Sequence, residues 1–324
     1  YWPYGYNSFH FDITKYLKPG EKNTLAVRLE NLPESSRWYP GAGLYRNVHL
    51  IITEDAYIPV WGTYITTPSV NEKFAKVNVR TKVVLPEGAD PAKYSVETSV
   101  WNPNKQKLTA VRTSLAQMKY NNNQAEQEFV IQTPSLWSPE MPALYSAETR
   151  LYEGDKLKDI YTTPFGIRSI EIIPDKGFFL NGKRTVFKGV CNHHDLGPLG
   201  AAVNDAAIRR QIRILKDMGC NAIRTSHNMP APELIRACDE MGMMIMAESF
   251  DEWNVAKCKN GYNLLFDEWA EKDLVNLLHN FRNNPSVVMW CIGNEVPNQW
   301  NEGDCKIAKW LQDICHREDP TRPV

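Results

Sequence analysis

The spacing of apolar and polar residues changes along the chain of 324 residues and divides it into three parts. Residues 1–56 and residues 57–165 carry apolar residues at many second positions, the period of a β-strand with one buried face. From residue 166 to residue 324, short apolar runs alternate with stretches of helical period. The pattern predicts two β-rich domains followed by an α/β domain, and the length also favours two or three domains.

The first part predicts a few strands of a larger β-sandwich. Apolar residues alternate over 9–13, 25–30 and 45–53, and a polar turn with Pro and Gly lies at 18–23. These strands are too few to close two sheets by themselves. We therefore expect residues 1–56 to be the C-terminal part of a sandwich, with further strands preceding them.

The second part predicts a complete sandwich. Residues 152–156, YEGDK, predict a hairpin turn between the last two strands. The spacing and a length of roughly 100 residues are typical of an immunoglobulin-like sandwich. Strands are expected over 76–85, 93–101, 127–133, 145–152 and 158–166.

The third part alternates strands with helices. Its strands are apolar at nearly every position, which predicts a parallel sheet with both faces covered. Asn204 is expected to cap the first helix, and Pro232 and Gly242 mark the start and end of the second. The expected strands cover 185–190, 221–226, 243–248 and 287–293, and the expected helices cover 204–218, 232–242, 267–282 and 303–317.

Polar residues follow each of these strands directly. The sequences are CNHHD (191–195), SHN (226–228), ESFDEW (248–253) and the pair Asn294–Glu295. A (β/α)8 barrel builds its active site at the carboxyl ends of its strands, and a doubly wound sheet also binds ligands there. No glycine-rich phosphate loop follows any of the strands, which disfavours dinucleotide binding.

Glu295 is the leading catalytic candidate. A carboxyl at the mouth of an apolar barrel is expected to be desolvated, which raises its pKa toward the value that a general acid needs. Asn294 beside it can donate to a substrate hydroxyl. The plainer interpretation of position alone is a solvated loop residue or a neighbour of a helix N-cap.

Other polar side chains at the strand ends have two interpretations each. One interpretation is a metal site formed by His193, His194 and His227 with Glu248 or Asp251. The other is hydrogen bonding of these histidines within a polar pocket. No HxH or HxxxH spacing supports the metal site. Arg224 can form a structural ion pair or hold Glu295. Trp253 can stack on a sugar or belong to the core.

Composition and charge narrow the classes of molecule that the protein can bind. A net charge of −1 argues against nucleic acid, and no apolar run reaches the roughly 18 residues of a membrane span. Ten Trp and fourteen Tyr offer flat faces for sugars, although core packing accounts for most of them. Seven Cys without a CxxC spacing are expected to be free, mostly buried thiols, which weakly favours a reducing compartment. The sequence does not decide the compartment or the oligomeric state, and a homo-oligomer stays open.

Several motifs, in order, resemble glycoside hydrolase family 2, which contains β-galactosidases, β-glucuronidases and β-mannosidases. The resemblance covers the whole chain and implies a partial jelly roll over 1–56, an immunoglobulin-like domain over 57–165 and the N-terminal half of a TIM barrel over 166–324. The motifs are SSRWYPGAGLYRNVHL (35–50), LWSPEMPALY (136–145) with FGIRSIEI (165–172), FFLNGKRTVFKGVCNHHDLGPLG (178–200), NAIRTSHNMP (221–230) and WCIGNE (290–295).

The resemblance implies a retaining exo-β-glycosidase, most similar to a β-galactosidase. Glu295 would be the acid/base, and Asn294 would contact the sugar 2-hydroxyl. The expected substrate-binding residues are Asn294, His227, His193, Glu248, Trp253 and Arg224. ESFDEW does not reproduce the acidic and histidine cluster of the magnesium-dependent β-galactosidases. No cofactor or essential magnesium ion is therefore expected, and a structural or activating Mg²⁺ or Na⁺ stays open.

The family places its nucleophile Glu after a later barrel strand, and residues 1–324 contain no such residue. We therefore expect the chain to be a fragment or truncation with no turnover by itself, since a retaining glycosidase needs two carboxyls. Three alternatives stay open: a β-glucuronidase or β-mannosidase of the same family, a non-catalytic carbohydrate-binding protein, and a metal-dependent hydrolase that uses the histidines.

Overall fold

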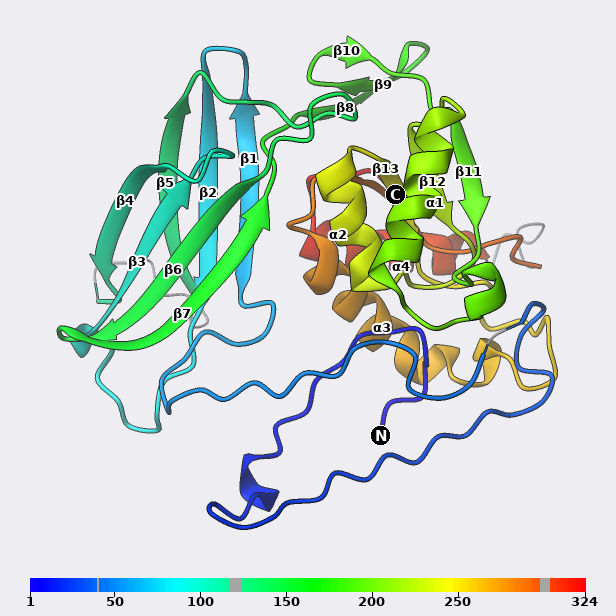
Figure 1. Ribbon diagram of the computed structural model, residues 1–324, viewed down its shortest axis with the longest axis horizontal. Helices are drawn as coiled ribbons and strands as arrows, with labels where there is room; N and C mark the ends of the chain where they lie inside the picture. The colour runs from blue at the N-terminus through cyan, green and yellow to red at the C-terminus, as the bar shows by residue number, and fades with distance from the viewer. Residues whose placement is uncertain (40, 117–123, 298–303) are drawn as a thin grey trace.

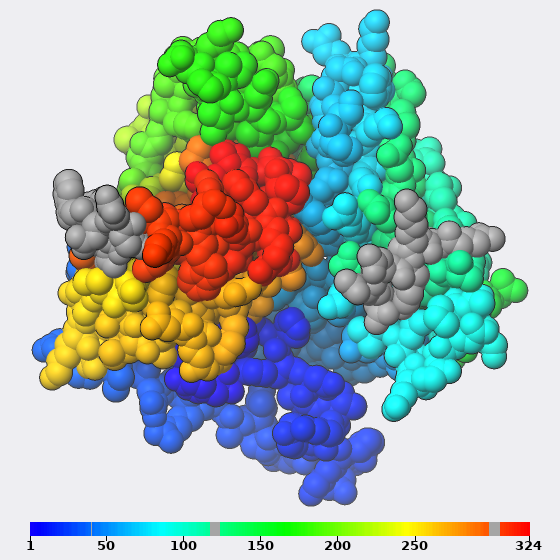
Figure 2. Space-filling view, turned by 180° about the vertical axis from the view of Figure 1, so that it is seen from behind, coloured from blue at the N-terminus to red at the C-terminus, as the bar shows by residue number. Residues whose placement is uncertain are grey.

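The computed structural model describes the chain except residues 40, 117–123 and 298–303. A β-sandwich and an α/β unit lie side by side, and residues 1–56 run along the lower side of both in Figure 1. Figure 2 shows the C-terminal residues, in red, beside the sandwich. At this junction the Tyr64 hydroxyl donates to the buried Asp319 carboxylate at 2.9 Å.

The N-terminal part differs from its prediction. Its described residues form one short 3-10 helix, η1 (Thr14–Tyr16), and no strand. The strands expected over 25–30 and 45–53 are wrong for this structure: the segments lack partner strands among the described residues, and Leu25 and Leu50 are exposed. An extended segment becomes a strand only when a neighbouring strand pairs with its N–H and C=O groups.

The sandwich consists of two antiparallel sheets. The sheet orders are β1-β2-β5 and β4-β3-β6-β7. Side chains from both sheets, such as Val77, Phe129 and Ala147, meet in a shared core. The strands are β1 (Thr63–Val70), β2 (Phe74–Lys82), β3 (Tyr94–Trp101), β4 (Lys107–Ser114), β5 (Gln124–Gln132), β6 (Tyr145–Glu153) and β7 (Lys156–Phe165). A short 3-10 helix, η2 (Pro91–Lys93), precedes β3.

All five predicted sandwich strands are present, and the hairpin turn at Gly154 joins β6 to β7. The prediction missed β1 and β4. Strand β1 contains Pro68 within an irregularity of its pairing, and a proline lowers the sequence signal for a strand. The side chains of β4 are mostly exposed, so its apolar alternation is weak.

A small meander connects the sandwich to the α/β unit. It contains β8 (Ile170–Ile173), β9 (Gly177–Leu180) and β10 (Lys183–Arg184). Phe178 and Leu180 pack with the fully buried Trp137 against residues near the starts of the parallel strands. The meander and the sandwich thus close the amino end of the parallel sheet.

The α/β unit has the predicted alternation of strands and helices, and its sheet is parallel in the order β11-β12-β13-β14. The strands are β11 (Gly189–Asn192), β12 (Ala222–Thr225), β13 (Met244–Glu248) and β14 (Val287–Cys291). The helices are α1 (Asp205–Asp217), α2 (Pro232–Met241), α3 (Phe266–Phe281) and α4 (Asp304–Glu318). Two short 3-10 helices, η3 (Gly197–Leu199) and η4 (Tyr262–Leu264), lie in the connections.

Helix termini follow the sequence signals. The Asn204 side chain accepts a hydrogen bond from the Ala207 N–H and caps α1. Gly242 ends α2 in a left-handed conformation, with φ at 71°. Met218, the last residue of the first predicted helix, lies at the C-cap of α1 and is exposed. Residue 303 of the last predicted helix lies outside the described residues.

The two faces of the parallel sheet differ. Ile223, Ile245 and Ala247 lie in a core shared with the helices, as predicted. Arg224 and Met246, on the opposite face, are only half-buried. The prediction that both faces are covered is therefore only partly correct for the described residues.

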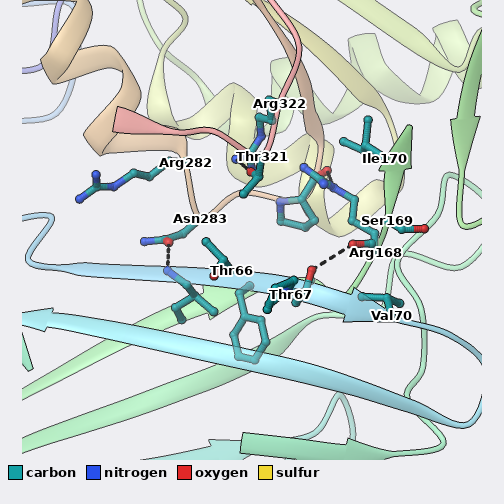
Figure 3. A pocket seen from close by; sticks show the side chains of 15 residues that line it. Thr66, Thr67, Val70, Arg168, Ser169, Ile170, Arg282, Asn283, Thr321 and Arg322 are labelled. Atoms are coloured by element: carbon teal, nitrogen blue, oxygen red, sulfur yellow. Dashed lines mark hydrogen bonds between the residues drawn. The ribbon is translucent and has the colours of Figure 1, made fainter. Parts of the chain in front are cut away.

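A pocket of about 270 Å³ lies between the sandwich and the amino end of the parallel sheet (Figure 3). Thr67 of β1 donates its hydroxyl to the Arg168 carbonyl, and Asn283 accepts from the Ile65 N–H. Asn283, Pro285 and Thr321 place the pocket at the strand starts. The pocket is therefore an interdomain joint, at the opposite end of the sheet from Asn294 and Glu295.

Candidate active site

The parallel sheet brings polar groups from three strands to one edge. Arg224 lies on β12, and His227 follows that strand by two residues. Glu248 is the last residue of β13, and Asn294 follows the end of β14 by three residues. Because parallel strands end at the same side of their sheet, these side chains meet at the predicted place.

Glu248 lies behind the site surface. Its side chain is 0% exposed, its Oε2 lies 2.8 Å from Arg224 Nε, and its Oε1 lies 3.0 Å from His227 Nδ1. Burial raises the pKa of Glu248 to about 8, and the Arg224 charge opposes the rise. Burial, with the Arg224 charge, lowers the pKa of His227 to about 4. The predicted direct contact of Glu248 with substrate is not available here, because the carboxyl is covered.

The side chain of Asn294 is held on both sides. Arg224 Nη2 donates to its Oδ1 at 3.0 Å, and its Nδ2 donates to Asp251 Oδ1 at 2.9 Å. A guanidinium can only donate and an ionised carboxylate can only accept, so this pair of partners fixes which end of the amide faces which side. Nδ2 makes this one hydrogen bond among the described residues, so its second hydrogen can donate to a ligand.

Asp251 is the most heavily bonded carboxylate of the site. Arg37 donates to it twice, from Nε at 3.1 Å and from Nη2 at 2.7 Å. Lys257 Nζ donates to its Oδ1 at 3.2 Å and to its main-chain oxygen at 2.7 Å. Burial alone would raise the pKa of Asp251, but the hydrogen bonds from Arg37 and Asn294, together with Lys257, hold it below its ordinary value.

Glu295 faces solvent at this edge. Its side chain is 73% exposed, and Arg37 Nη1 lies 3.6 Å from its Oε2. The desolvation expected for this carboxyl is therefore absent among the described residues. Its backbone is left-handed, with φ at 42°, a conformation that side chains other than glycine adopt rarely. Such conformations concentrate at functional sites, which supports the choice of Glu295.

Trp253 belongs to the core of the α/β unit. Its side chain is nearly covered, and its Nε1 donates to the Ile292 carbonyl at 2.8 Å. A Cβ at Gly293 would lie 2.7 Å from this Nε1, so the glycine allows the indole to pack against the chain leaving β14. The predicted stacking role of Trp253 is not supported by this placement.

Three aromatic rings line one side of the site. The rings of Trp38 and His193 have centroids 5.1 Å apart, and those of His193 and His227 lie 5.3 Å apart at a right angle. His193 is exposed and His227 is half-buried, so both predicted pocket residues border the surface beside Asn294.

Sequence reasoning missed Arg37, Trp38 and Lys257 as site residues. Arg37 and Trp38 lie within the motif at 35–50, which was the one available signal. The motif does not show that it contacts residues more than 200 positions later. Lys257 carries no sequence signal beyond its closeness to ESFDEW.

The described residues contain no group of three or more His, Cys, Asp and Glu side chains that could hold a metal ion. The nearby acidic groups Glu248 and Asp251 are paired with Arg224, Arg37 and Lys257, a donor set that does not suit Mg²⁺.

The seven Cys are free, as expected, although only Cys238 and Cys315 are buried. In the part of the chain that the structure describes, no helix combines the length and apolar character of a membrane span.

Comparisons with known proteins agree with the motifs. The family model described as "Glycosyl hydrolases family 2" matches residues 57–168, and the model described as "Glycosyl hydrolases family 2, TIM barrel domain" matches residues 171–324. The β-galactosidase BoGH2A of Bacteroides ovatus is 46% identical over 301 residues, which are 93% of this chain and 35% of that protein. A β-glucuronidase of Bacteroides fragilis is 31% identical over an alignment of 335 positions, which covers 99% of this chain and 48% of that protein.

Structural similarity extends over the same region. The crystal structure of a glycosyl hydrolase family 2 member from Bacteroides cellulosilyticus has a TM-score of 0.92 and 37% identity, covering 98% of this chain and 41% of that chain. The chain thus spans 35% and 48% of the two relatives named above. Family models over most of its length, matching relatives and the shared fold lead to one conclusion: the chain belongs to glycoside hydrolase family 2.

Proposed function

We propose that the protein is a retaining exo-β-glycosidase that acts on terminal β-D-galactosides. One observation carries the proposal. Glu295, exposed and in a left-handed backbone conformation, directly follows an asparagine whose amide is fixed in one orientation at the carboxyl edge of the sheet. This arrangement supports the proposed roles of Glu295 as proton donor and of Asn294 as a group that binds a sugar hydroxyl.

In the proposed mechanism Glu295 protonates the glycosidic oxygen as the bond to the leaving group breaks, and later takes a proton from the attacking water. The remaining amide hydrogen of Asn294 donates to the sugar 2-hydroxyl. A hydrogen bond to this hydroxyl strengthens as the neighbouring carbon gains positive charge. His193 and His227 would line the sugar subsite.

The mechanism requires a second carboxyl as nucleophile. Asp251 accepts hydrogen bonds from Arg37, Asn294 and Lys257, and Glu248 is fully covered, so neither is free to attack a sugar. Since the family places its nucleophile Glu after a later barrel strand, we propose a Glu outside residues 1–324 for this role. The four parallel strands would then be the first half of a (β/α)8 barrel that the rest of the protein completes.

Charge pairing favours a neutral sugar. A glucuronide carries a carboxylate that binds best to an unpaired cation; among the described residues of this edge, Arg37 and Lys257 are paired with Asp251, and Arg224 donates to Asn294. The similarity to the β-galactosidase BoGH2A points the same way. A β-glucuronidase or β-mannosidase is the second candidate, and the similarity to the Bacteroides fragilis β-glucuronidase supports it.

The test is Glu295→Gln in the full-length natural protein. With an alkyl β-galactoside, whose leaving group needs protonation, we expect kcat/KM to fall by about 10²–10⁴. With a dinitrophenyl β-galactoside the loss should be much smaller, because that leaving group departs without a proton. Full activity of the variant on the alkyl substrate would contradict the assignment.

Asp175→Asn is a matched control. Asp175 is exposed and left-handed, with φ at 63°, but lies in the turn between β8 and β9. Its substitution should leave both activities unchanged. A wild-type protein that binds galactose but hydrolyses no β-galactoside, β-glucuronide or β-mannoside would instead indicate a carbohydrate-binding protein.

A further inference from the structure

One wall of the candidate site comes from the N-terminal part of the chain. The arm, defined as residues 33–47 without residue 40, lies along the carboxyl edge of the parallel sheet. Its position is fixed at both ends. The main-chain N–H and side-chain amide of Asn260 donate to the Glu34 and Pro33 carbonyls, and Arg46 donates to the Met229 carbonyl at 2.7 Å.

Two further contacts fix the middle of the arm. A Cβ at Gly41 would lie 2.6 Å from Ala201 Cβ, so the backbone of the arm approaches the α/β unit closely. Trp38 Nε1 donates to the Tyr6 hydroxyl at 3.1 Å. The placement of Arg37 is therefore a property of the whole arm and does not depend on a single surface contact.

Arg37 binds Asp251 in a forked geometry. Nε and Nη2 reach the two different oxygens of the carboxylate, the planar arrangement that a guanidinium forms and an ammonium cannot. An exposed ion pair contributes little to stability. Asp251, however, is only 12% exposed, and Lys257, which also pairs with Asp251, is 8% exposed. Here a partly open arginine stabilises a largely buried carboxylate.

The contact passes directly to the proposed sugar-binding group. The same oxygen that Arg37 Nη2 reaches, Asp251 Oδ1, accepts from Asn294 Nδ2. Moving or rotating Asp251 would remove the acceptor that orients the amide. The third nitrogen of Arg37, Nη1, faces Glu295 at 3.6 Å. Arg37 of the arm thus contacts Asp251, which orients Asn294, and also contacts Glu295.

We propose that Arg37 is a positioning residue of the glycosidase site: the arm uses it to hold Asp251, and Asp251 in turn orients the Asn294 amide toward the sugar 2-hydroxyl. This inference rests on the proposed function. Arg37 does not contact Asn294 directly and reaches it only through Asp251. Its effect should therefore depend on whether the substrate carries the hydroxyl that Asn294 binds.

The experiment compares aryl β-galactoside with its 2-deoxy analogue in the full-length natural protein. Arg37→Gln should lower kcat/KM about 10–100-fold on the galactoside and less than about threefold on the 2-deoxy substrate. Arg37→Lys should resemble Arg37→Gln, since an ammonium cannot bind both carboxylate oxygens. Arg28→Gln, which removes an exposed arginine paired with Glu30, is the control and should change neither rate.

The double variant Arg37→Gln, Asn294→Ala separates positioning from general destabilisation. It should be no more sensitive to loss of the 2-hydroxyl than Asn294→Ala alone. Equal losses of Arg37→Gln on both substrates would overturn the inference, because a structural defect affects both alike. An unchanged rate on the galactoside would also overturn it. Failure of Glu295→Gln to lose activity would instead remove the proposed function on which the inference rests.

Discussion

The sandwich and the α/β unit both bury polar side chains, but of different kinds. In the sandwich, four of them are neutral hydroxyls that form two pairs: Thr63 with Thr163 at 2.5 Å, and Thr98 with Thr149 at 3.4 Å. Such a pair satisfies itself and needs no third partner. Its burial serves packing between strands and offers nothing to a ligand.

At the carboxyl edge of the parallel sheet, charged side chains and the Asn294 amide form a chain around the buried Glu248. Glu248, Arg224, Asn294, Asp251 and Arg37 follow one another through ion pairs and hydrogen bonds. Burying charges has a high desolvation cost, which these ion pairs and hydrogen bonds offset. The carboxyl edge thus differs from the sandwich in that its polar groups are linked from one to the next, whereas the two threonine pairs are isolated. Three substitutions can break or sharpen this distinction.

The largest effect is expected for Asn294→Ala. The change removes the proposed hydroxyl donor and leaves Arg224 and Asp251 without their shared partner, so kcat/KM should fall about 10²-fold or more. The unfolding free energy should fall by about 1–3 kcal/mol. Steady-state kinetics on an aryl β-galactoside and urea unfolding measure the two effects.

A matched asparagine lies in the sandwich. Asn102 Oδ1 accepts from the Asn104 and Gln106 N–H groups, and its Nδ2 donates to Gln106 Oε1. Asn102→Ala should lower stability by about 1 kcal/mol and leave kcat/KM unchanged. Similar kinetic losses in the two variants would show that the distinction between the regions is wrong.

The second effect concerns pH and Glu248. The folded protein holds the pKa of this carboxyl at about 8, above the ordinary value of 4.5. As pH rises between these values, the unfolded chain loses the proton first, so the contribution of Glu248 favours folding at low pH and is lost toward pH 8. In Glu248→Gln this pH dependence should disappear.

Urea unfolding of wild type and Glu248→Gln at pH 5 and pH 8 tests the sign. Relative to the variant, wild type should lose about 3–4 kcal/mol between the two pH values, because the unfolded chain has released this proton over most of the interval and each pH unit then corresponds to about 1.4 kcal/mol. The difference between the proteins removes the contributions of His227 and other groups. The same pH dependence in both proteins would refute the assignment to Glu248.

The smallest effect is expected for Thr98→Val in the sandwich. The substitution leaves the Thr149 hydroxyl without its partner and should cost about 1 kcal/mol, with no change in kcat/KM. The double variant Thr98→Val, Thr149→Val removes both hydroxyls and should recover most of that loss. A double variant less stable than the single one would show that the pair has a role beyond satisfying itself.

Much of the fold could be predicted from local patterns. The alternation of strands and helices in the α/β unit follows from apolar periodicity, and the ends of α1 and α2 follow from Asn204 and Gly242. The strands β1 and β4 were missed, because Pro68 and weak apolar alternation hide them. The N-terminal strands were predicted wrongly for this structure, because strand formation depends on a partner that a local pattern does not reveal.

The candidate site could be predicted only in part. Polar residues after apolar strands pointed to His227, Glu248, Asn294 and Glu295, since parallel strands share one carboxyl edge. The same reasoning did not distinguish an exposed Glu295 from a covered Glu248, or a core Trp253 from a stacking one. Burial depends on what packs over a side chain, and those neighbours come from distant parts of the chain.

By itself the sequence determined the family resemblance, the order of the three parts and the edge of the sheet where the chemistry should lie, because motifs and periodicity are local in the chain. Only the tertiary structure showed that the arm carries Arg37 and Trp38 to that edge, and that Arg37 meets Asp251 and Glu295 there. A contact across more than 200 residues is decided by how domains pack, and no local pattern contains that information.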